Sequence, residues 1–309
     1  MRRATAMLLV VLAPAAFCRA GENPTDPDRL GELVFSDLYG DEFRAVADSD
    51  GSAKLELARS MLTRAELWGG NRTFVILHYR RAYELTSGYA SHYDVAVKAM
   101  RRQAERFPDT RIECLQRVAE VQRRMAGRSG WSRDVSRQLM TTLLELAESA
   151  ERDGNLARAA MLTREAGQVA RRSGGDGADE LQQRARELVI LANVARRADA
   201  LKQRLQRDPD DSEARTHLVL LEVTERDDPA TARKLLTPEL DADLRHHVRL
   251  AAADPAELSA RQCRELSRWY EDLARTGSPV ARRNAGDRAE KYEQLAAGGP
   301  LAAAIGADG

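Results

Sequence analysis

The sequence predicts an all-α protein, a right-handed α-solenoid of stacked helix hairpins with one long helix near 178–207. Apolar residues recur at spacings of three and four from about residue 29 to 296, as on the buried face of amphipathic helices. Arg, Leu, Ala and Glu are abundant and aromatic residues make up only 5%, which favours helices. The period-two alternation of strands is missing. Amphipathic hairpins in series bury their apolar stripes by stacking on their neighbours.

Residues 1–20 have the pattern of a secretory signal peptide. Arg2 and Arg3 precede an apolar run over 6–17, and small residues follow it. The run is shorter than the roughly 20 residues that span a bilayer. We therefore expect the leader to be cleaved and the protein to be exported to the cell envelope, either to the periplasm or to the outside of the cell. An uncleaved anchor or a buried helix is the alternative. Phe17 precedes Cys18 where a lipidation motif needs a small residue, which argues against a lipoprotein.

The first predicted group of helical repeats covers 29–126. Asp48-Ser49-Asp50-Gly51-Ser52 resembles part of a calcium loop but lacks its later acidic ligands, so we interpret it as the turn and N-cap before a helix over 53–68. Asn71, inside a glycosylation sequon, is expected to start the next helix. Pro108 is expected to end the helix that contains Phe107.

The second predicted group, a central hairpin and the long helix, covers 131–207. A Gly- and Ser-containing boundary at 127–130 precedes helices over 133–153 and 155–172. Segment 141–172 comes closest to a tetratricopeptide (TPR) unit of about 34 residues, although the consensus Trp, Tyr and Pro are missing. Small residues fall where paired helices must approach closely, at Gly154, Ala157, Ala160 and Ala166.

The third predicted group of helical repeats covers 208–296. Acidic residues before or beside proline predict helix starts, because their side chains accept hydrogen bonds from the free amides of the first turn. These starts are Asp208-Pro209-Asp210-Asp211-Ser212, Asp227-Asp228-Pro229 and Asp254-Pro255. Residues 297–309 lack any helical pattern and are expected to form a disordered tail.

Composition and motifs exclude several classes of function. Lys and Arg total 48, as do Asp and Glu, so no basic excess favours nucleic acid as a partner. Acidic residues also interleave with the arginines at helical spacing, as in Glu180, Arg184 and Glu187. No apolar run after the leader is long enough to span a membrane. No phosphate-binding glycine loop, nucleophile elbow or acid–base pair of carboxylates is recognisable, which predicts no enzyme activity and no cofactor.

Cysteine and histidine give no metal-site pattern. Cys114 and Cys263 each lie in an apolar helical stripe, and we expect two buried free thiols rather than a disulfide. His246 and His247 project about 100° apart on a helix, so we interpret them as exposed helix residues and predict no metal site.

Several segments resemble a family of exported helical-repeat proteins common in planctomycete bacteria. The resemblance rests on Ala- and Leu-rich helices and on a C-terminal Trp-Tyr-Glu-Asp-Leu-Ala, and it covers most of the chain after the leader. The segments are 34–40, 55–62, 78–85, 94–107, 144–170, 209–211, 235–236, 269–274 and 288–292. The resemblance implies a degenerate TPR-like fold and no catalytic residues.

These observations predict a non-enzymatic exported scaffold that binds an unidentified protein or peptide on its concave face. Candidate contacts are the large side chains Trp68, Tyr79, Tyr83 and Tyr93, although a position in the core is the favoured interpretation of each one. Two alternatives stay open: a structural cell-envelope component without a discrete ligand, and an accessory subunit of an envelope enzyme.

Overall fold

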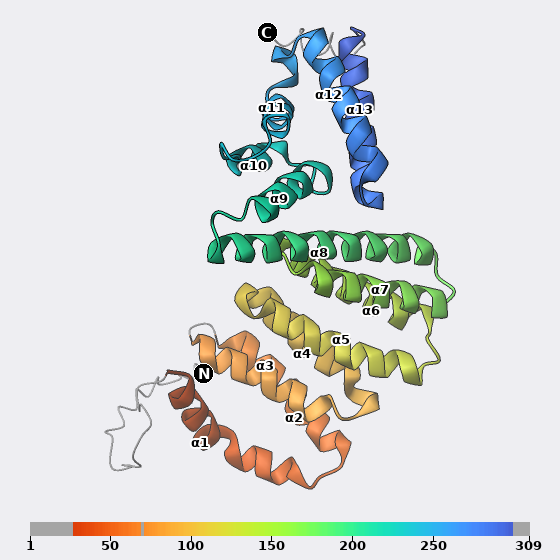
Figure 1. The fold of residues 1–309 in the computed structure, drawn as a ribbon. Helices are drawn as coiled ribbons and strands as arrows, with labels where there is room; N and C mark the ends of the chain where they lie inside the picture. The colour runs from red at the N-terminus through yellow and green to blue at the C-terminus, as the bar shows by residue number, and fades with distance from the viewer. Residues whose placement is uncertain (1–26, 69–70, 299–309) are drawn as a thin grey trace. The chain divides into compact units, whose positions relative to one another are not determined.

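The structure is a computed structural model that describes residues 27–68 and 71–298 (Figure 1). These residues form thirteen α-helices and three short 3₁₀ helices, without a strand among them, which confirms the all-α prediction. The predicted leader over 1–20 and most of the predicted tail lie outside the described residues. The chain divides into two compact units, 1–129 and 130–309, and the division falls within the segment 127–130.

Over 27–68 and 71–129, the first unit contains five α-helices. Helices α2 to α5 pack mainly against their neighbours in sequence, whereas α1 packs more on α3 than on α2. They are α1 (Pro27–Ala47), α2 (Gly51–Leu67), α3 (Arg72–Thr86), α4 (Tyr93–Arg106) and α5 (Arg111–Arg128), with 3₁₀ turns at Ala90–His92 and Pro108–Thr110. Apolar side chains from all five helices form one continuous core. This arrangement follows from amphipathic stripes that only neighbouring helices can cover.

Local capping interactions start two of these helices as the sequence predicts. The Asp50 carboxylate accepts hydrogen bonds from the amides of Ser52 and Ala53, at 3.1 and 3.3 Å, and so caps α2. The Asn71 side chain accepts from the amide of Phe74 at 3.2 Å and caps α3. Segment 48–52 is therefore the N-cap turn of a helix, which confirms that interpretation.

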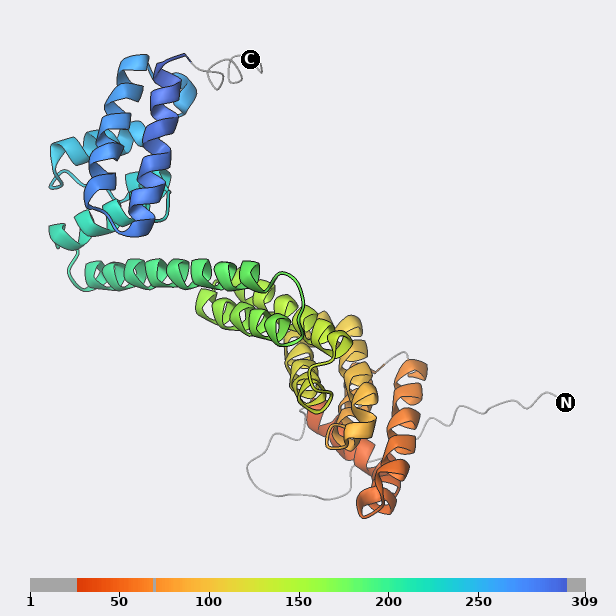
Figure 2. The same ribbon diagram turned by 90° about the vertical axis from the view of Figure 1, so that its right-hand side faces the viewer.

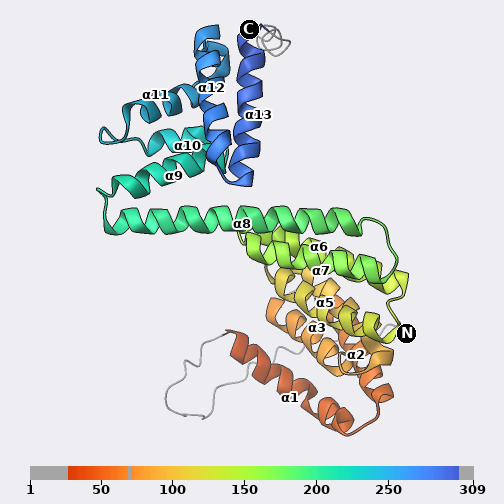
Figure 3. The same cartoon turned by 45° about the vertical axis from the view of Figure 1, so that its right-hand side comes forward.

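Between residues 130 and 298 the second unit contains eight α-helices. Their order along the chain can be followed in Figure 3. They are α6 (Arg133–Arg152), α7 (Leu156–Arg172), α8 (Ala178–Arg207), α9 (Ser212–Thr224), α10 (Pro229–Lys234), α11 (Ala242–Ala251), α12 (Ala260–Thr276) and α13 (Pro279–Ala296), with a 3₁₀ turn at Pro255–Glu257. The long helix predicted over 178–207 is confirmed as α8. Figure 2 shows α12 and α13, in blue, side by side and antiparallel.

Helix α8 contributes to two successive cores. Its Leu188 packs among small side chains of α6 and α7, whereas Val194 and Ala198 further along pack with Leu218 and Leu221 of α9. The sequence separates 131–207 from 208–296, but both segments belong to the same compact unit because α8 packs against α7 and against α9.

Helix starts in the second unit agree with the sequence at two of three places. The carboxylates of Asp211 and Asp228 cap α9 and α10. Asp254 starts only the short 3₁₀ turn, so the amphipathic run expected directly after Pro255 begins later. Ser259 starts α12 instead: its hydroxyl accepts from the amide of Gln262, whose side chain accepts from the Ser259 amide in return.

Small residues bring α7 close to its neighbours, but not at every predicted position. Ala160 and Ala166 are buried, as close packing requires. Ala157 is exposed, so the prediction of a close approach there is wrong. Gly167 was not among the predicted positions, yet a methyl group added to it would lie 3.3 Å from the Ala178 carbonyl oxygen on α8. A glycine at this position allows the close contact between α7 and α8.

Candidate functional site

Three of the four aromatic candidates lie in the core of the first unit. Tyr79, Tyr83 and Tyr93 are buried, in agreement with the interpretation of them as core residues, and they offer no open contact surface. Trp68 is 41% exposed and stacks on Phe74 with ring centroids 5.2 Å apart. The helices that carry these tyrosines are covered from both sides in sequence, because α3 packs against α2 and α4, and α4 packs against α3 and α5.

Both cysteines of the described residues are buried and free, which confirms the interpretation of them as free thiols. Burial raises the pKa of Cys114 and of Cys263 above its ordinary value. A thiol with a raised pKa is a poor nucleophile, because the thiolate is the reactive form. Neither residue therefore carries a candidate catalytic site.

The adjacent histidines of α11 both contact one carboxylate on α12. Nε2 of His246 lies 2.8 Å and Nε2 of His247 lies 3.6 Å from Oε1 of Glu265. His247 also stacks on Trp269, so it is half-buried rather than exposed as the sequence suggested. Across 27–68 and 71–298, no three His, Cys, Asp or Glu side chains are placed to hold a metal ion.

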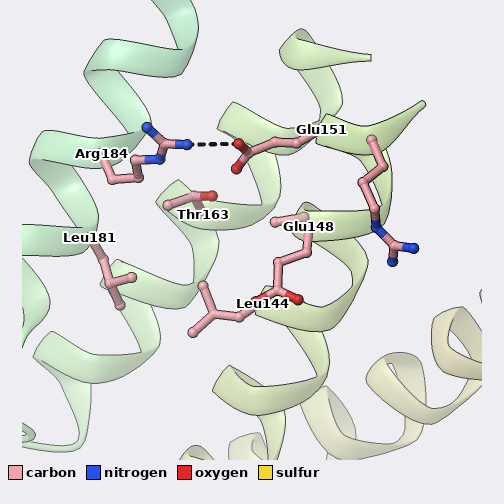
Figure 4. A pocket seen from close by; sticks show the side chains of 8 residues that line it. Leu144, Glu148, Glu151, Thr163, Leu181 and Arg184 are labelled. Carbon is pink, nitrogen blue, oxygen red and sulfur yellow. Dashed lines mark hydrogen bonds and ion pairs between the residues drawn. The ribbon is translucent and has the colours of Figure 1, made fainter. Parts of the chain in front are cut away.

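A groove on the α6–α7 hairpin and the start of α8 is the best candidate binding site of the second unit (Figure 4). It encloses about 530 Å³. Leu144 of α6 and Leu181 of α8 line opposite sides, and the nearly buried Thr163 of α7 lies at the base. The groove exists because α7 packs against both α6 and α8 and leaves room between these two helices.

Charged groups border the apolar part of the groove. The Arg184 guanidinium on α8 donates to the Glu151 carboxylate on α6 at 2.7 Å and so links the two sides (Figure 4). Glu148, one turn before Glu151, is exposed and forms no hydrogen bond or ion pair within the described part of the chain. The sequence suggested an ion pair within one helix for Arg184, and this pair forms with Glu187 at 3.9 Å; the shorter pair, with Glu151 on another helix, was not predicted.

The groups that line the groove can contact both an apolar and a charged side chain of a ligand. Leucine side chains on both sides can cover an aliphatic side chain, and the free carboxylate of Glu148 can accept hydrogen bonds from a lysine or arginine. Among the described residues that line the groove, Thr163 carries the one hydroxyl group, and no histidine lies beside it to act as a base. The sequence signal for this site was weak, since its residues look like the solvated face of any amphipathic hairpin.

A further cavity of about 450 Å³, lined by residues of α8, α9 and the start of α13, contains charges that are already paired. Arg197 of α8 forms an ion pair with Glu225, a nearly buried residue at the end of α9. Because the ion pair satisfies both charges, this cavity has less to offer a charged ligand than the groove.

Comparison with known proteins identifies no relative: no protein-family model matches the chain, and no curated protein matches its sequence. None of the helices within the described ranges combines the length and the apolar character needed to cross a membrane.

Proposed function

We propose that this chain is a non-enzymatic, exported helical-repeat protein that binds a protein or peptide in the groove of α6, α7 and α8. The observation that carries the proposal is the free Glu148 carboxylate beside the apolar sides formed by Leu144 and Leu181. The ligand is a segment with an aliphatic side chain next to a lysine or arginine, because the first fits between the leucines and the second pairs with Glu148.

The proposal extends to the architecture. The hairpins form a right-handed TPR-like solenoid, and the chain is a member of the exported helical-repeat proteins that it resembles. Close packing of α7 on α8 at Gly167 is consistent with hairpins that stack in series. The leader over 1–20 is cleaved on export to the cell envelope. N-terminal sequencing of protein from the envelope fraction tests this step, and an intact Met1 on protein from the cytosol contradicts it.

Peptide binding tests the function directly. The chain without its leader is applied to an array of octapeptides in which leucine and arginine occupy every pair of positions, and hits are measured by fluorescence anisotropy. Leu144→Lys places a charge in the groove, so we expect it to weaken binding about tenfold or more. Met161→Lys is the matched control, because Met161 is exposed on α7 and does not line the groove.

Charge recognition is tested separately with Glu148→Gln. We expect two- to fivefold weaker binding of the arginine peptide, roughly the range of an exposed ion pair, and no change for its glutamine analogue. Equal binding by wild type, Leu144→Lys and Met161→Lys would exclude the groove. An array without any saturable hit would favour a structural envelope component.

A further inference from the structure

We propose that a cavity between α11 and α12 binds an acidic peptide segment through three arginine side chains. The cavity encloses about 470 Å³. Arg261, Arg264 and Arg268 of α12 line it, together with Trp269 of the same helix and His247 of α11. It shares no residue with the groove of α6, α7 and α8, so this inference does not depend on the proposed function.

The three guanidinium groups have no partner in the described part of the chain. All three side chains are exposed, and none forms a hydrogen bond or ion pair with residues 27–68 or 71–298. Each carries a fixed positive charge and several donors in a planar fork that matches a carboxylate. The three guanidinium groups of the cavity are therefore available to bind the carboxylates of a ligand.

The two carboxylates in the same cavity form no ion pair with the three arginines, and each contacts another side chain. Glu265 is contacted by His246 and His247 of α11. Asp272 accepts a hydrogen bond from Arg275, one turn further along α12, at 2.8 Å. Arg261 and Arg268 each have an acidic residue four positions later, at 265 and 272, yet no ion pair forms within either pair.

The spacing of the arginines favours a ligand with several separated negative charges. Positions 261, 264 and 268 lie on one face of α12, spread over about 10 Å at 1.5 Å per residue. Alternate residues of an extended peptide point to the same side about 6.6 Å apart. Acidic residues at alternate positions can therefore meet successive arginines, whereas one small anion cannot reach all three.

A flat apolar wall beside the arginines accommodates the rest of such a peptide. The ring centroids of Trp269 and His247 lie 5.1 Å apart with an interplanar angle of 10°, and Trp269 is only half-buried. Apolar side chains of the ligand can pack on this stack. Glu265 and Asp272 disfavour a nucleic acid, because its phosphates form a continuous line of charge that must pass both carboxylates.

Binding of a labelled peptide with the sequence Glu-Leu-Glu-Leu-Glu tests the proposal. Fluorescence anisotropy is measured with the chain without its leader, at low salt and at about 0.15 M salt. The triple variant Arg261→Gln, Arg264→Gln, Arg268→Gln is expected to bind about tenfold to a hundredfold more weakly, or two- to fivefold for each ion pair lost. A peptide with glutamine in place of glutamate is expected to bind to the wild type as weakly as the acidic peptide binds to the triple variant.

The matched control removes three exposed arginines of the same unit that lie outside the cavity. In the variant Arg233→Gln, Arg249→Gln, Arg283→Gln we expect less than about a threefold change, since the net charge falls equally but the cavity stays intact. Equal weakening in both triple variants would overturn the site and leave only the general field of the protein. Far-ultraviolet circular dichroism verifies that both variants are folded.

Two competitors test the assignment of the ligand class. Displacement of the peptide by millimolar inorganic phosphate would identify a small-anion site and overturn the peptide assignment. Tighter binding of a single-stranded DNA 12-mer than of the peptide, lost in the first triple variant, would identify a nucleic-acid site and overturn it too. Failure of the groove experiment leaves these outcomes unaffected, because Leu144 and Glu148 lie outside this cavity.

Discussion

Tyr270 of α12 stacks on Tyr292 of α13, with ring centroids 5.8 Å apart and an interplanar angle of 13°. Both side chains are fully buried in the core of this helix pair. The Tyr270 hydroxyl has no hydrogen-bond partner within the described ranges. Burial raises the pKa of each phenol, and for Tyr270 the proximity of Tyr292 adds to the effect.

Tyr270→Phe is expected to leave the free energy of unfolding unchanged or higher at neutral pH. The ring and its stacking stay, while a buried hydroxyl that satisfies no hydrogen bond is removed, and such groups cost about 1–3 kcal/mol to bury. Urea denaturation followed by circular dichroism measures the difference. A loss above about 1 kcal/mol would show that the hydroxyl has a partner in solution.

The tyrosine pair also predicts lower stability in alkali. In the folded state the pKa of each phenol lies above its ordinary value of about 10. At a pH between these two pKa values, the tyrosines of the unfolded chain lose their protons while those of the folded chain keep them. The free energy of unfolding is therefore unaffected by these groups below about pH 10 and falls above it. Denaturation at a series of pH values should show a smaller fall for Tyr270→Phe than for the wild type.

His78 predicts lower stability of the first unit in acid. Its Nδ1 donates to the Phe74 carbonyl oxygen at 2.7 Å, and its buried Nε2 has no partner within 27–68 or 71–298. Burial lowers the pKa of His78 and the charge of Arg64 lowers it further, against the opposing effect of the hydrogen bond. Below its ordinary pKa of about 6.5 the unfolded chain therefore binds a proton more readily than the folded chain does.

The His78 effect is measured by hydrogen exchange of α3 between about pH 7 and pH 5. Protection of α3 should fall with the pH in the wild type and fall less in His78→Gln, which cannot titrate in this range. Identical slopes for the two proteins would show that the imidazole becomes protonated without cost.

Two leucines of α8 provide a matched pair for the packing of this helix. Leu188 is fully buried among Ala150, Ala159 and Ala160, whereas Leu191, one turn later, is 41% exposed. Leu188→Ala should lower the free energy of unfolding by about 2–5 kcal/mol, and Leu191→Ala by less than about 1 kcal/mol. Similar losses in urea denaturation would contradict the packing of α8 on the α6–α7 hairpin.

Glu222 of α9 is a fully buried carboxylate whose partners lie nearer to solvent. Arg226 donates to its Oε1 at 2.9 Å, and the Lys202 ammonium lies 4.0 Å from the same oxygen. Arg226→Met leaves the buried charge with the distant lysine alone, so we expect a loss of at least about 2 kcal/mol. Adding Glu222→Gln to Arg226→Met should restore part of it, and no recovery in the double variant would contradict a charge effect.

Helix boundaries were predictable wherever a local signal acts alone. Gly177 ends a turn and Asp208 follows the last residue of α8, so the predicted range 178–207 agrees with the structure. The signal at Asp254-Pro255 is equally local but ambiguous, because the same pair can start a 3₁₀ turn. The capping box that starts α12 is also a local signal, because Ser259 and Gln262 have the spacing that it requires.

The candidate sites were much less predictable. Leu144, Glu148 and Arg184 form part of one groove although they come from helices that are separated by α7 in the sequence. Likewise, the sequence shows acidic residues near Arg261 and Arg268 but not that histidines and Arg275 contact those acids. Whether a charged side chain stays free depends on partners that come from other helices, or from a position on the other side of its acidic neighbour along the same helix.

The all-α class, the extent of the long helix and the burial of both cysteines were predictable without the structure, because the hydrophobic period and the helix caps are local properties of the chain. The packing of the helices decides that three of the four candidate aromatic residues are core, and that Glu148 and three arginines of α12 have no partner among the described residues. Burial and ion pairing depend on how neighbouring helices pack, and side-chain distances across helices are not encoded in spacing along one of them.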